Sequence, residues 1–175
     1  MKLKHYPLPK KYSFSKDQSS GLFLEKRGDR VHCGIDLYAP VKTPVFAVDD
    51  GIIRLTSEFS SPHQTSYWNT TYEIILEVES SYFFRFAELS TVFVRKEENV
   101  SAGDKIGLVG QVLNPKKINE HHPPYIQQLK KKNNLSMLHF EMYNRYPKKS
   151  KHYLGGNWFA KKTPPGLCNP TEFLR

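Results

Sequence analysis

Glu73-Ile-Ile-Leu-Glu-Val78 and Tyr82-Phe-Phe-Arg-Phe-Ala87 are the two stretches that decide the fold class of this chain. Both are runs of β-branched and aromatic residues of strand length, and Glu79-Ser-Ser81 between them is a turn-forming sequence. Together they predict two antiparallel strands joined by a short turn.

Comparable runs lie on both sides of this pair. Further stretches of strand length are residues 45–48, 52–56 and 137–143, and the glycine-bearing residues 100–110 suit a turn feeding a short strand. Helical signals are confined to one or two turns near residues 125–130 and one turn near residues 169–174. We therefore expect a mainly β protein built on a folded antiparallel sheet.

Length and composition predict one globular domain. The chain has 175 residues, of which 38% are hydrophobic, and this is enough to fill a single core. Residues 1–29 are polar and interrupted by Pro7, Pro9 and Gly21, so we expect an irregular lead-in with at most one short strand. Residues 30–175 form the predicted domain, and long loops at 57–72 and 111–136 are expected to wall a groove.

The charge of the chain favours anionic partners without naming one. There are 26 Lys plus Arg against 17 Asp plus Glu, which gives a formal charge of +9. The basic residues occur in short clusters and no nucleic-acid-binding motif accompanies them, so a solvated basic surface is the favoured interpretation. The sequence shows neither an apolar run long enough to span a bilayer nor a secretory signal at its start, and we expect a monomer.

Two cysteines carry little information about compartment. Cys33 and Cys168 can form a disulfide only if the fold brings them close, and two free thiols are an equally good expectation. Neighbouring side chains of an extended strand point to opposite faces, so Cys33 should face away from His32 and be buried.

Three residues have the chemistry of a catalytic metal site. His32 and Asp36 are four residues apart, which places them on one face of a strand and turn, and His139 lies in a separate predicted strand. Two imidazoles and one carboxylate with an open fourth position are typical of a Zn²⁺ site that activates water. Polar residues at strand ends remain the alternative explanation.

The strand around His139 extends this set. Strand alternation places Met137, His139 and Glu141 on one face, and Leu138 and Phe140 in the core. Glu141 is therefore a candidate for orienting the imidazole of His139, a common arrangement around metal-binding histidines.

The order of motifs resembles the lysostaphin-like (LytM-like) zinc endopeptidases, which cut peptide cross-links in bacterial cell walls. The resemblance rests on the His-x-x-x-Asp segment at residues 30–51, on residues 86–90 and 100–110, on Met137-Leu-His-Phe-Glu141 and on residues 169–174. It implies a duplicated hybrid motif as the fold, peptidoglycan or its peptides as the partner, and the cell envelope or exterior as the location.

Matched position by position, the resemblance makes His32, Asp36 and His139 the zinc ligands. The two further active-site histidines of the family map to Glu88 and Met137, and neither is histidine here. One hypothesis is a peptidase in which Glu88 serves as general base. The other is a catalytically inactive zinc-binding homologue that acts as a wall-binding or regulatory module, and a third is a basic module for anionic polymers.

Other residues are weaker candidates for the site. His63, His121 and His122 are expected to be solvated loop residues, with a role as substitute acid or base as the alternative. Tyr67 and Trp68, with Tyr72, either line a substrate groove or pack on their own sheet.

Overall fold

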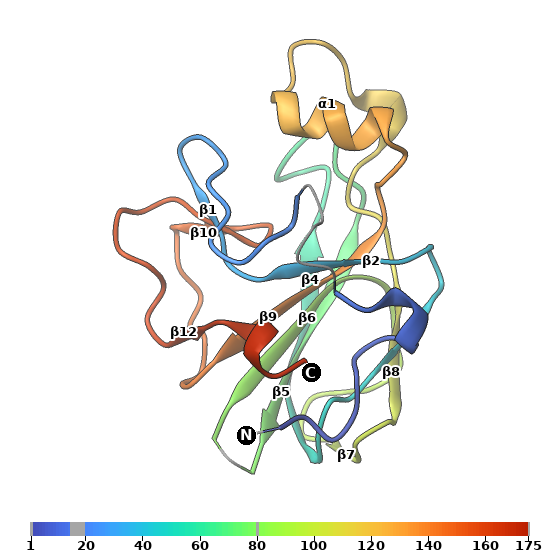
Figure 1. The fold of residues 1–175 in the computed structure, drawn as a ribbon, viewed down its shortest axis with the longest axis vertical. Helices are drawn as coiled ribbons and strands as arrows, with labels where there is room; N and C mark the ends of the chain where they lie inside the picture. The colour runs from blue at the N-terminus through green and yellow to red at the C-terminus, as the bar shows by residue number, and fades with distance from the viewer. Residues whose placement is uncertain (1, 15–19, 80, 175) are drawn as a thin grey trace.

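The computed structural model describes residues 2–14, 20–79 and 81–174, and it is a curved antiparallel sheet with one helix at its edge (Figure 1). The strands are β1 (Val31–His32), β2 (Ile35–Tyr38), β3 (Pro44–Phe46), β4 (Gly51–Ser60), β5 (Thr71–Val78), β6 (Phe83–Val92), β7 (Asn99–Val100), β8 (Lys105–Val109), β9 (Met137–Tyr143), β10 (Tyr153–Leu154), β11 (Asn157–Trp158) and β12 (Leu167–Cys168). The helix α1 is Pro124–Lys131, and the 3₁₀ turns η1, η2 and η3 are Lys10–Tyr12, Pro115–Lys117 and Pro170–Glu172. The predicted mainly β fold is confirmed.

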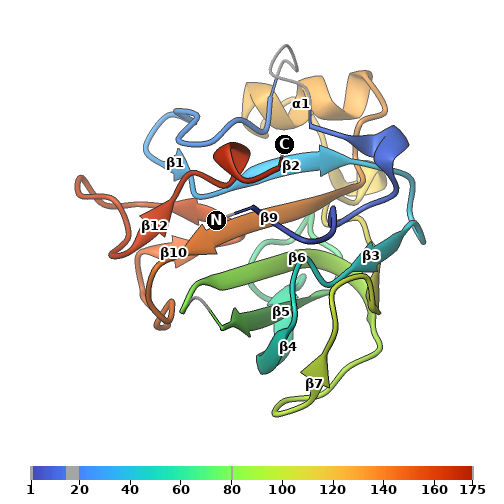
Figure 2. The same ribbon diagram turned by 60° about the horizontal axis from the view of Figure 1, so that its bottom comes forward.

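Strand β6 organises the main sheet. One of its edges pairs with β5, whereas the other is divided, because Phe83–Ala87 pairs with β9 and Leu89–Val92 pairs with β8. Strand β2 then pairs with the far edge of β9, and the β4–β5 ribbon extends the sheet on the other side. Figure 2 shows β2, β9, β6, β5 and β4 succeeding one another across the molecule. The division of β6 creates a fork in the sheet at residue 88.

A separate three-stranded sheet, in the order β1-β11-β10, stands beside β9. The sequence did not predict the short strands β10, β11 and β12, because their segments show only single apolar residues and no alternating run. Their pairing matters because it fixes β1, which carries His32, through the register His32↔Asn157.

The core lies beneath one face of the main sheet. Leu138, Phe140 and Met142 of β9 point into it with Phe84 and Phe86 of β6, as alternation predicted. The rings of Phe84 and Phe140 stack at 5.7 Å. The opposite face of these strands is therefore free to carry polar side chains.

One of the two predicted long loops is shorter than expected. The loop predicted at 57–72 spans only residues 61–70, because β4 runs on to Ser60 and β5 begins at Thr71. Ser60 and Thr71 are buried, and their hydroxyls lie 2.7 Å apart, which closes this end of the ribbon. The connection predicted at 111–136 does contain a short helix, α1, where it was expected.

The predicted lead-in contributes to the core. Leu8 is buried in the main cluster, and the amide of Phe46 donates to the carbonyl of Pro7. Residues 1 and 15–19 of this segment, and Ser80 of the predicted turn, lie outside the described residues. Across the described chain no helix is both long and apolar enough to cross a membrane.

Candidate metal centre

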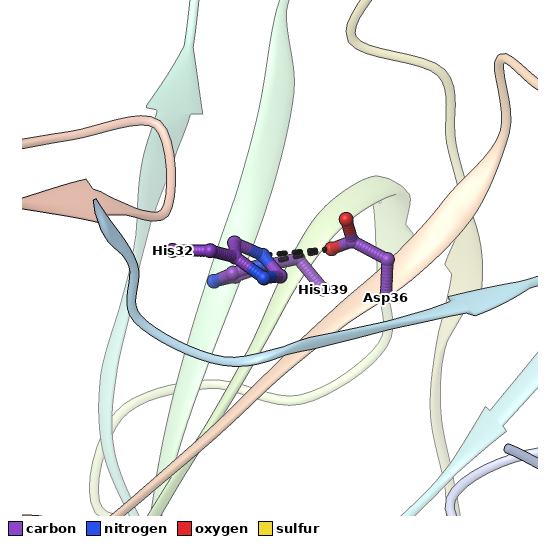
Figure 3. Close-up of side chains that lie close together, drawn as sticks. All are labelled: His32, Asp36 and His139. Carbon is purple, nitrogen blue, oxygen red and sulfur yellow. Dashed lines mark hydrogen bonds and ion pairs between the residues drawn. The ribbon is translucent and has the colours of Figure 1, made fainter. Parts of the chain in front are cut away.

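The three predicted ligands converge from three different strands. His32 ends β1, Asp36 lies in β2 and His139 lies in β9, and Figure 3 shows their polar ends directed at one another. Asp36 and His139 are direct cross-strand partners, so the β2–β9 pairing brings them together. His32 reaches them because the chain bends at Gly34, where a Cβ atom would lie 2.4 Å from the carbonyl oxygen of Phe140.

The ligand atoms form a small triangle. The Nδ1 of His139 lies 3.0 Å from Asp36 Oδ1 and 3.0 Å from His32 Nε2, and His32 Nε2 lies 3.1 Å from Asp36 Oδ1. Ligand bonds of about 2.0–2.1 Å in a tetrahedral zinc site give ligand-to-ligand separations of about 3.3 Å. All three residues are buried. The donor types and the spacing therefore fit a zinc ion.

Hydrogen bonds select the imidazole nitrogens that face the triangle. His32 Nδ1 lies 2.9 Å from the carbonyl oxygen of Leu22, and His139 Nε2 lies 2.7 Å from Glu141 Oε1. A carbonyl or carboxylate at these distances fixes the proton on that nitrogen. His32 Nε2 and His139 Nδ1 are then the nitrogens that face the metal position.

The pKa values of the two histidines in the triangle are shifted in opposite directions. Burial lowers the pKa of His32, which therefore favours the neutral, metal-binding form. Burial acts in the same direction on His139, but its hydrogen bonds to Asp36 and Glu141 override this and raise its pKa to about 9. Burial opposes the ionised form of Asp36, but the nearby His32 and His139 hold its pKa well below the usual range. A metal must therefore displace a proton from His139.

Glu141 is the centre of a second set of contacts. It accepts hydrogen bonds from Tyr143 and Tyr153, both at 2.7 Å, and from Arg85 Nη1 at 2.6 Å. Arg85 Nε lies 2.8 Å from Glu73 Oε2, so one buried guanidinium bridges two carboxylates. Burial disfavours the ionised carboxylate of Glu141, yet Arg85 and His139 keep its pKa far below the usual range.

The sequence predicted Glu141 but not its partners. A charged residue between Phe84 and Phe86 was a detectable signal, because an arginine inside an apolar strand needs a partner. The partner itself follows from the cross-strand register Arg85↔Glu141, which the sequence does not show.

Arg27 holds the outer oxygen of Asp36 and was also missed. Its Nη2 donates to Asp36 Oδ2 at 3.1 Å and lies 2.9 Å from Glu25 Oε2. The amide of Asp36 donates to the carbonyl of Gly21, whose own φ is +85°. A Cβ atom on Gly21 would lie 2.5 Å from that of Asp36. Residues 20–27 thus cover one side of the site.

Gly156 allows the smaller sheet to approach His139. Its φ is +74°, and a Cβ atom at this position would lie 2.6 Å from His139 Nε2. The carbonyl of Gly156 accepts from the amide of Cys33 at 2.8 Å. Only a residue without a side chain fits between the two sheets here.

Glu88 lies at the fork of β6. It has a φ of +65°, which is strained for a residue with a side chain, and its carbonyl accepts from Gly110 at 2.7 Å. Its Oε2 atom is shielded from solvent and has no hydrogen-bond partner among the described residues. Burial, with a smaller contribution from the negative charge of Asp36, raises the pKa of Glu88 to about 8. Such a group at a strained position is a functional candidate.

The remaining candidates lie elsewhere. His121 is exposed, and His122 packs edge-on against Tyr67 with ring centroids 4.4 Å apart. His63 is exposed in the 61–70 loop. None of them belongs to the group of potential metal ligands found in the described chain, which contains His32, Asp36 and His139. They are therefore not potential ligands of the same metal ion, and their role as substitute acid or base stays a hypothesis.

The predictions for Met137, for the loop aromatic residues and for the cysteines can also be compared with the structure. Met137 is buried and lies in β9 two residues before His139. Tyr67 and Trp68 pack into a small cluster with Leu113, Ile118, Ile126 and Leu135, which ties the 61–70 loop to α1, whereas Tyr72 is exposed. Cys33 is buried, as expected, and both cysteines are free thiols.

Comparison with known families decides the classification. The model of peptidase family M23 matches residues 30–151, which is more than half of the chain and includes all three potential ligands. The chain belongs to peptidase family M23. The matched range also contains the His-x-x-x-Asp segment on which the resemblance to this family was based.

Two curated relatives of this M23 chain are bacterial. It is 32% identical over 79 residues to the peptidoglycan DD-endopeptidase ShyA of Vibrio cholerae. The aligned segment covers 45% of this chain and 16% of ShyA. The chain is 31% identical over 107 residues to an uncharacterised metalloprotease of Buchnera aphidicola, covering 60% of the chain and 26% of that protein. The M23 chain therefore spans about a quarter or less of the length of these relatives.

Solved structures agree with the M23 fold. Lysostaphin from Staphylococcus simulans superposes with a TM-score of 0.58 at 19% identity, covering 97% of this chain and 53% of lysostaphin. A zinc-containing peptidase from Vibrio cholerae gives a TM-score of 0.55 at 24% identity, covering 83% and 38% of the two chains. At these identities the similarity establishes the fold.

Proposed function

We propose that this M23 chain is a zinc metalloendopeptidase that hydrolyses peptide cross-links of bacterial peptidoglycan. The observation that carries the proposal is the triangle of His32, Asp36 and His139, whose ligand atoms converge within 3.0–3.1 Å with the protonated nitrogens turned outward. The relative named a peptidoglycan DD-endopeptidase supports the choice of substrate class.

Zinc at this triangle would polarise a scissile carbonyl and make water acidic enough to attack near neutral pH. The protein contributes the geometry. Glu141 and the carbonyl of Leu22 orient the two imidazoles, and Arg27 occupies the second oxygen of Asp36, so that one carboxylate oxygen faces the metal position. Three protein ligands leave a fourth position open for water or substrate.

Glu88 is the proposed general base. Its shielded Oε2 atom has no hydrogen-bond partner among the described residues and, once the carboxyl is ionised, can accept the proton of the attacking water, as carboxylates do in other zinc peptidases. The positive charge of a zinc ion at the triangle would favour that ionised form, because it would lower the raised pKa of Glu88. Its position supports this role, because residue 88 follows Ala87, the cross-strand partner of the ligand His139. In the family pattern the corresponding residue is a histidine, so the proposal replaces an imidazole by a carboxylate. Met137 then shapes the pocket and takes no part in proton transfer.

The test combines metal content with hydrolysis. The zinc-loaded protein should bind one zinc per chain, and it should release new amino groups from purified peptidoglycan. Glu88→Gln should retain zinc and lose about a hundred- to ten-thousandfold in rate, which is the range typical of a positioned proton-transfer group. Glu79→Gln, at an exposed position in the turn after β5, is the matched control and should keep full activity.

Other outcomes identify the alternatives. Zinc binding and co-sedimentation with peptidoglycan, without release of amino groups, would make the chain a catalytically inactive wall-binding or regulatory homologue. Sedimentation that survives chelation and disappears at high salt would instead indicate a basic module for anionic polymers, because salt screens exposed charges. An undiminished rate in Glu88→Gln would exclude Glu88 as the base.

A further inference from the structure

A trough runs along the polar face of the sheet, beginning beside the metal ligands. It consists of two adjoining cavities of about 590 and 490 Å³, which share Arg85, Tyr153 and residues 146–150 of their linings. Such volumes are those of ligand-binding clefts. The larger cavity is called the near cavity below and the smaller one the far cavity.

The near cavity adjoins the metal centre. Phe59 in its wall stacks on the ring of His139, with centroids 6.0 Å apart and an angle of 25° between the planes. Gly155, also in the lining, precedes the glycine that lies against His139. The near cavity therefore lies directly beyond the residues that pack against His139.

The acidic side chains of the trough lie in the near cavity only. Glu58 and Glu73 line the near cavity and are absent from the far one. Lys148 and Lys149 line both cavities, whereas Arg145 lines only the far one, and the described lining of the far cavity contains no acidic side chain. No ion pair involves these three cations among the described residues, whereas Arg85 on the floor is already paired with two carboxylates.

The walls of the far cavity are flat and partly apolar. Its lining includes the rings of Tyr143, Tyr146 and Trp158 together with Pro164 and Pro165. Tyr146 is 41% exposed although its ring packs on Phe83. Such walls accommodate a peptide backbone and aliphatic side chains, while the lysines above them attract negative charge.

We propose that the far cavity is a subsite for the free carboxylates of an acidic peptide whose scissile bond lies at the metal. This inference rests on the proposed function, since the closeness of the trough to the metal centre is the reason for proposing a peptide as the occupant. The trough orients that peptide, because its carboxylates are attracted to the far cavity, where Arg145 adds to the two shared lysines, and are repelled from the near cavity by Glu58. The chain thus selects acidic over neutral peptides on one side of the bond.

The experiment measures equilibrium binding to the full chain, both zinc-loaded and treated with chelator. The probes are soluble peptides released from peptidoglycan with their carboxylates free, and the same peptides with those carboxylates amidated. Free carboxylates should strengthen binding by about five- to tenfold, as expected of two or three exposed charge contacts, and salt should reduce the difference. The double variant Lys148→Glu/Lys149→Glu should abolish the preference.

A second double variant controls for net charge. Lys116→Glu/Lys117→Glu changes the charge equally at the exposed turn η2, which does not line the trough, and it should keep the preference. Equal binding of free and amidated peptides by the parent, or equal loss in both double variants, overturns the proposal. Stronger competition by inorganic polyphosphate than by the acidic peptide would also overturn it, because the site would then be one for phosphate polymers.

Hydrolysis distinguishes the two proposals. Preferential binding of acidic peptides without release of amino groups would refute the peptidase function and leave the subsite intact. Hydrolysis of free and amidated peptides with the same KM would refute the subsite and leave the peptidase function intact.

Discussion

Two glutamates close to the metal ligands lie in opposite surroundings. Glu141, where β6 pairs with β9, is contacted by Arg85, Tyr143, Tyr153 and His139, and its negative charge is fully accommodated. Glu88, one residue beyond that pairing, lies at the fork with a strained backbone and an oxygen atom without a partner. The first arrangement holds a residue in place, and the second leaves a carboxylate available for reaction.

The largest expected effect comes from removing the counter-charge of Glu141. Arg85→Met leaves two carboxylates buried without their cation, and such a loss destabilises a protein by about 3–5 kcal/mol. Chemical denaturation should show this loss. Arg54→Met, which removes an exposed pair with Glu77 and Glu97, is the control and should change stability little. Similar stabilities of the two variants would contradict the importance assigned to Glu141.

Substitution of the two glutamates should change zinc affinity to different extents. Glu141→Gln weakens the contact that orients His139, so zinc affinity should fall about ten- to a hundredfold, as for other partners of metal-binding histidines. Glu88→Gln should leave the affinity within about threefold of the parent, because Glu88 is outside the ligand triangle. Competition with a chromophoric chelator measures both. A larger loss in Glu88→Gln would make Glu88 a ligand.

The pH dependence of zinc binding should reflect the contacts of His139. Because Asp36 and Glu141 raise its pKa to about 9, the metal-free protein is protonated there at neutral pH, and zinc must displace that proton. The apparent affinity should therefore rise about tenfold per pH unit toward pH 9 and level off above it. An affinity that is constant between pH 7 and 9 would show that His139 is already neutral.

A further prediction concerns the stability of the metal-free protein as a function of pH. The pKa of Glu88 is raised to about 8 in the folded state from about 4.3 in an unfolded chain, so its stabilising contribution is complete below pH 4.3 and is lost as pH rises through 8. Glu88→Gln should therefore match the parent at pH 4 and exceed it at pH 8. The gain at pH 8 is on the order of a few kcal/mol, because each unit of pKa difference is worth about 1.4 kcal/mol, and each kcal/mol raises Tm by about 2–4 °C.

Thermal unfolding in the presence of chelator at the two pH values measures this difference. A Glu88→Gln variant that is less stable than the parent at pH 8 would show that the carboxylate is stabilised by contacts in the folded protein. Glu88 would then resemble Glu141, and the contrast between the two sites would disappear.

Local sequence patterns determined the strands, the ligand types and the family. Alternation in residues 137–143 places His139 and Glu141 opposite the core residues Leu138 and Phe140, because successive side chains of a strand point to opposite faces. The four-residue spacing of His32 and Asp36 likewise predicted that their side chains lie on one face. These features depend on neighbours in the chain, so the sequence alone was sufficient.

Tertiary structure decided which side chains complete the site. Arg85 meets Glu141, and Arg27 meets Asp36, through a strand register and a chain crossing that no local pattern encodes. The fork that isolates Glu88 likewise arises because β8 and β9 share one edge of β6. The sequence therefore named the potential metal ligands, whereas long-range pairing determined how they are held and left beside them one carboxylate oxygen without a hydrogen-bond partner among the described residues.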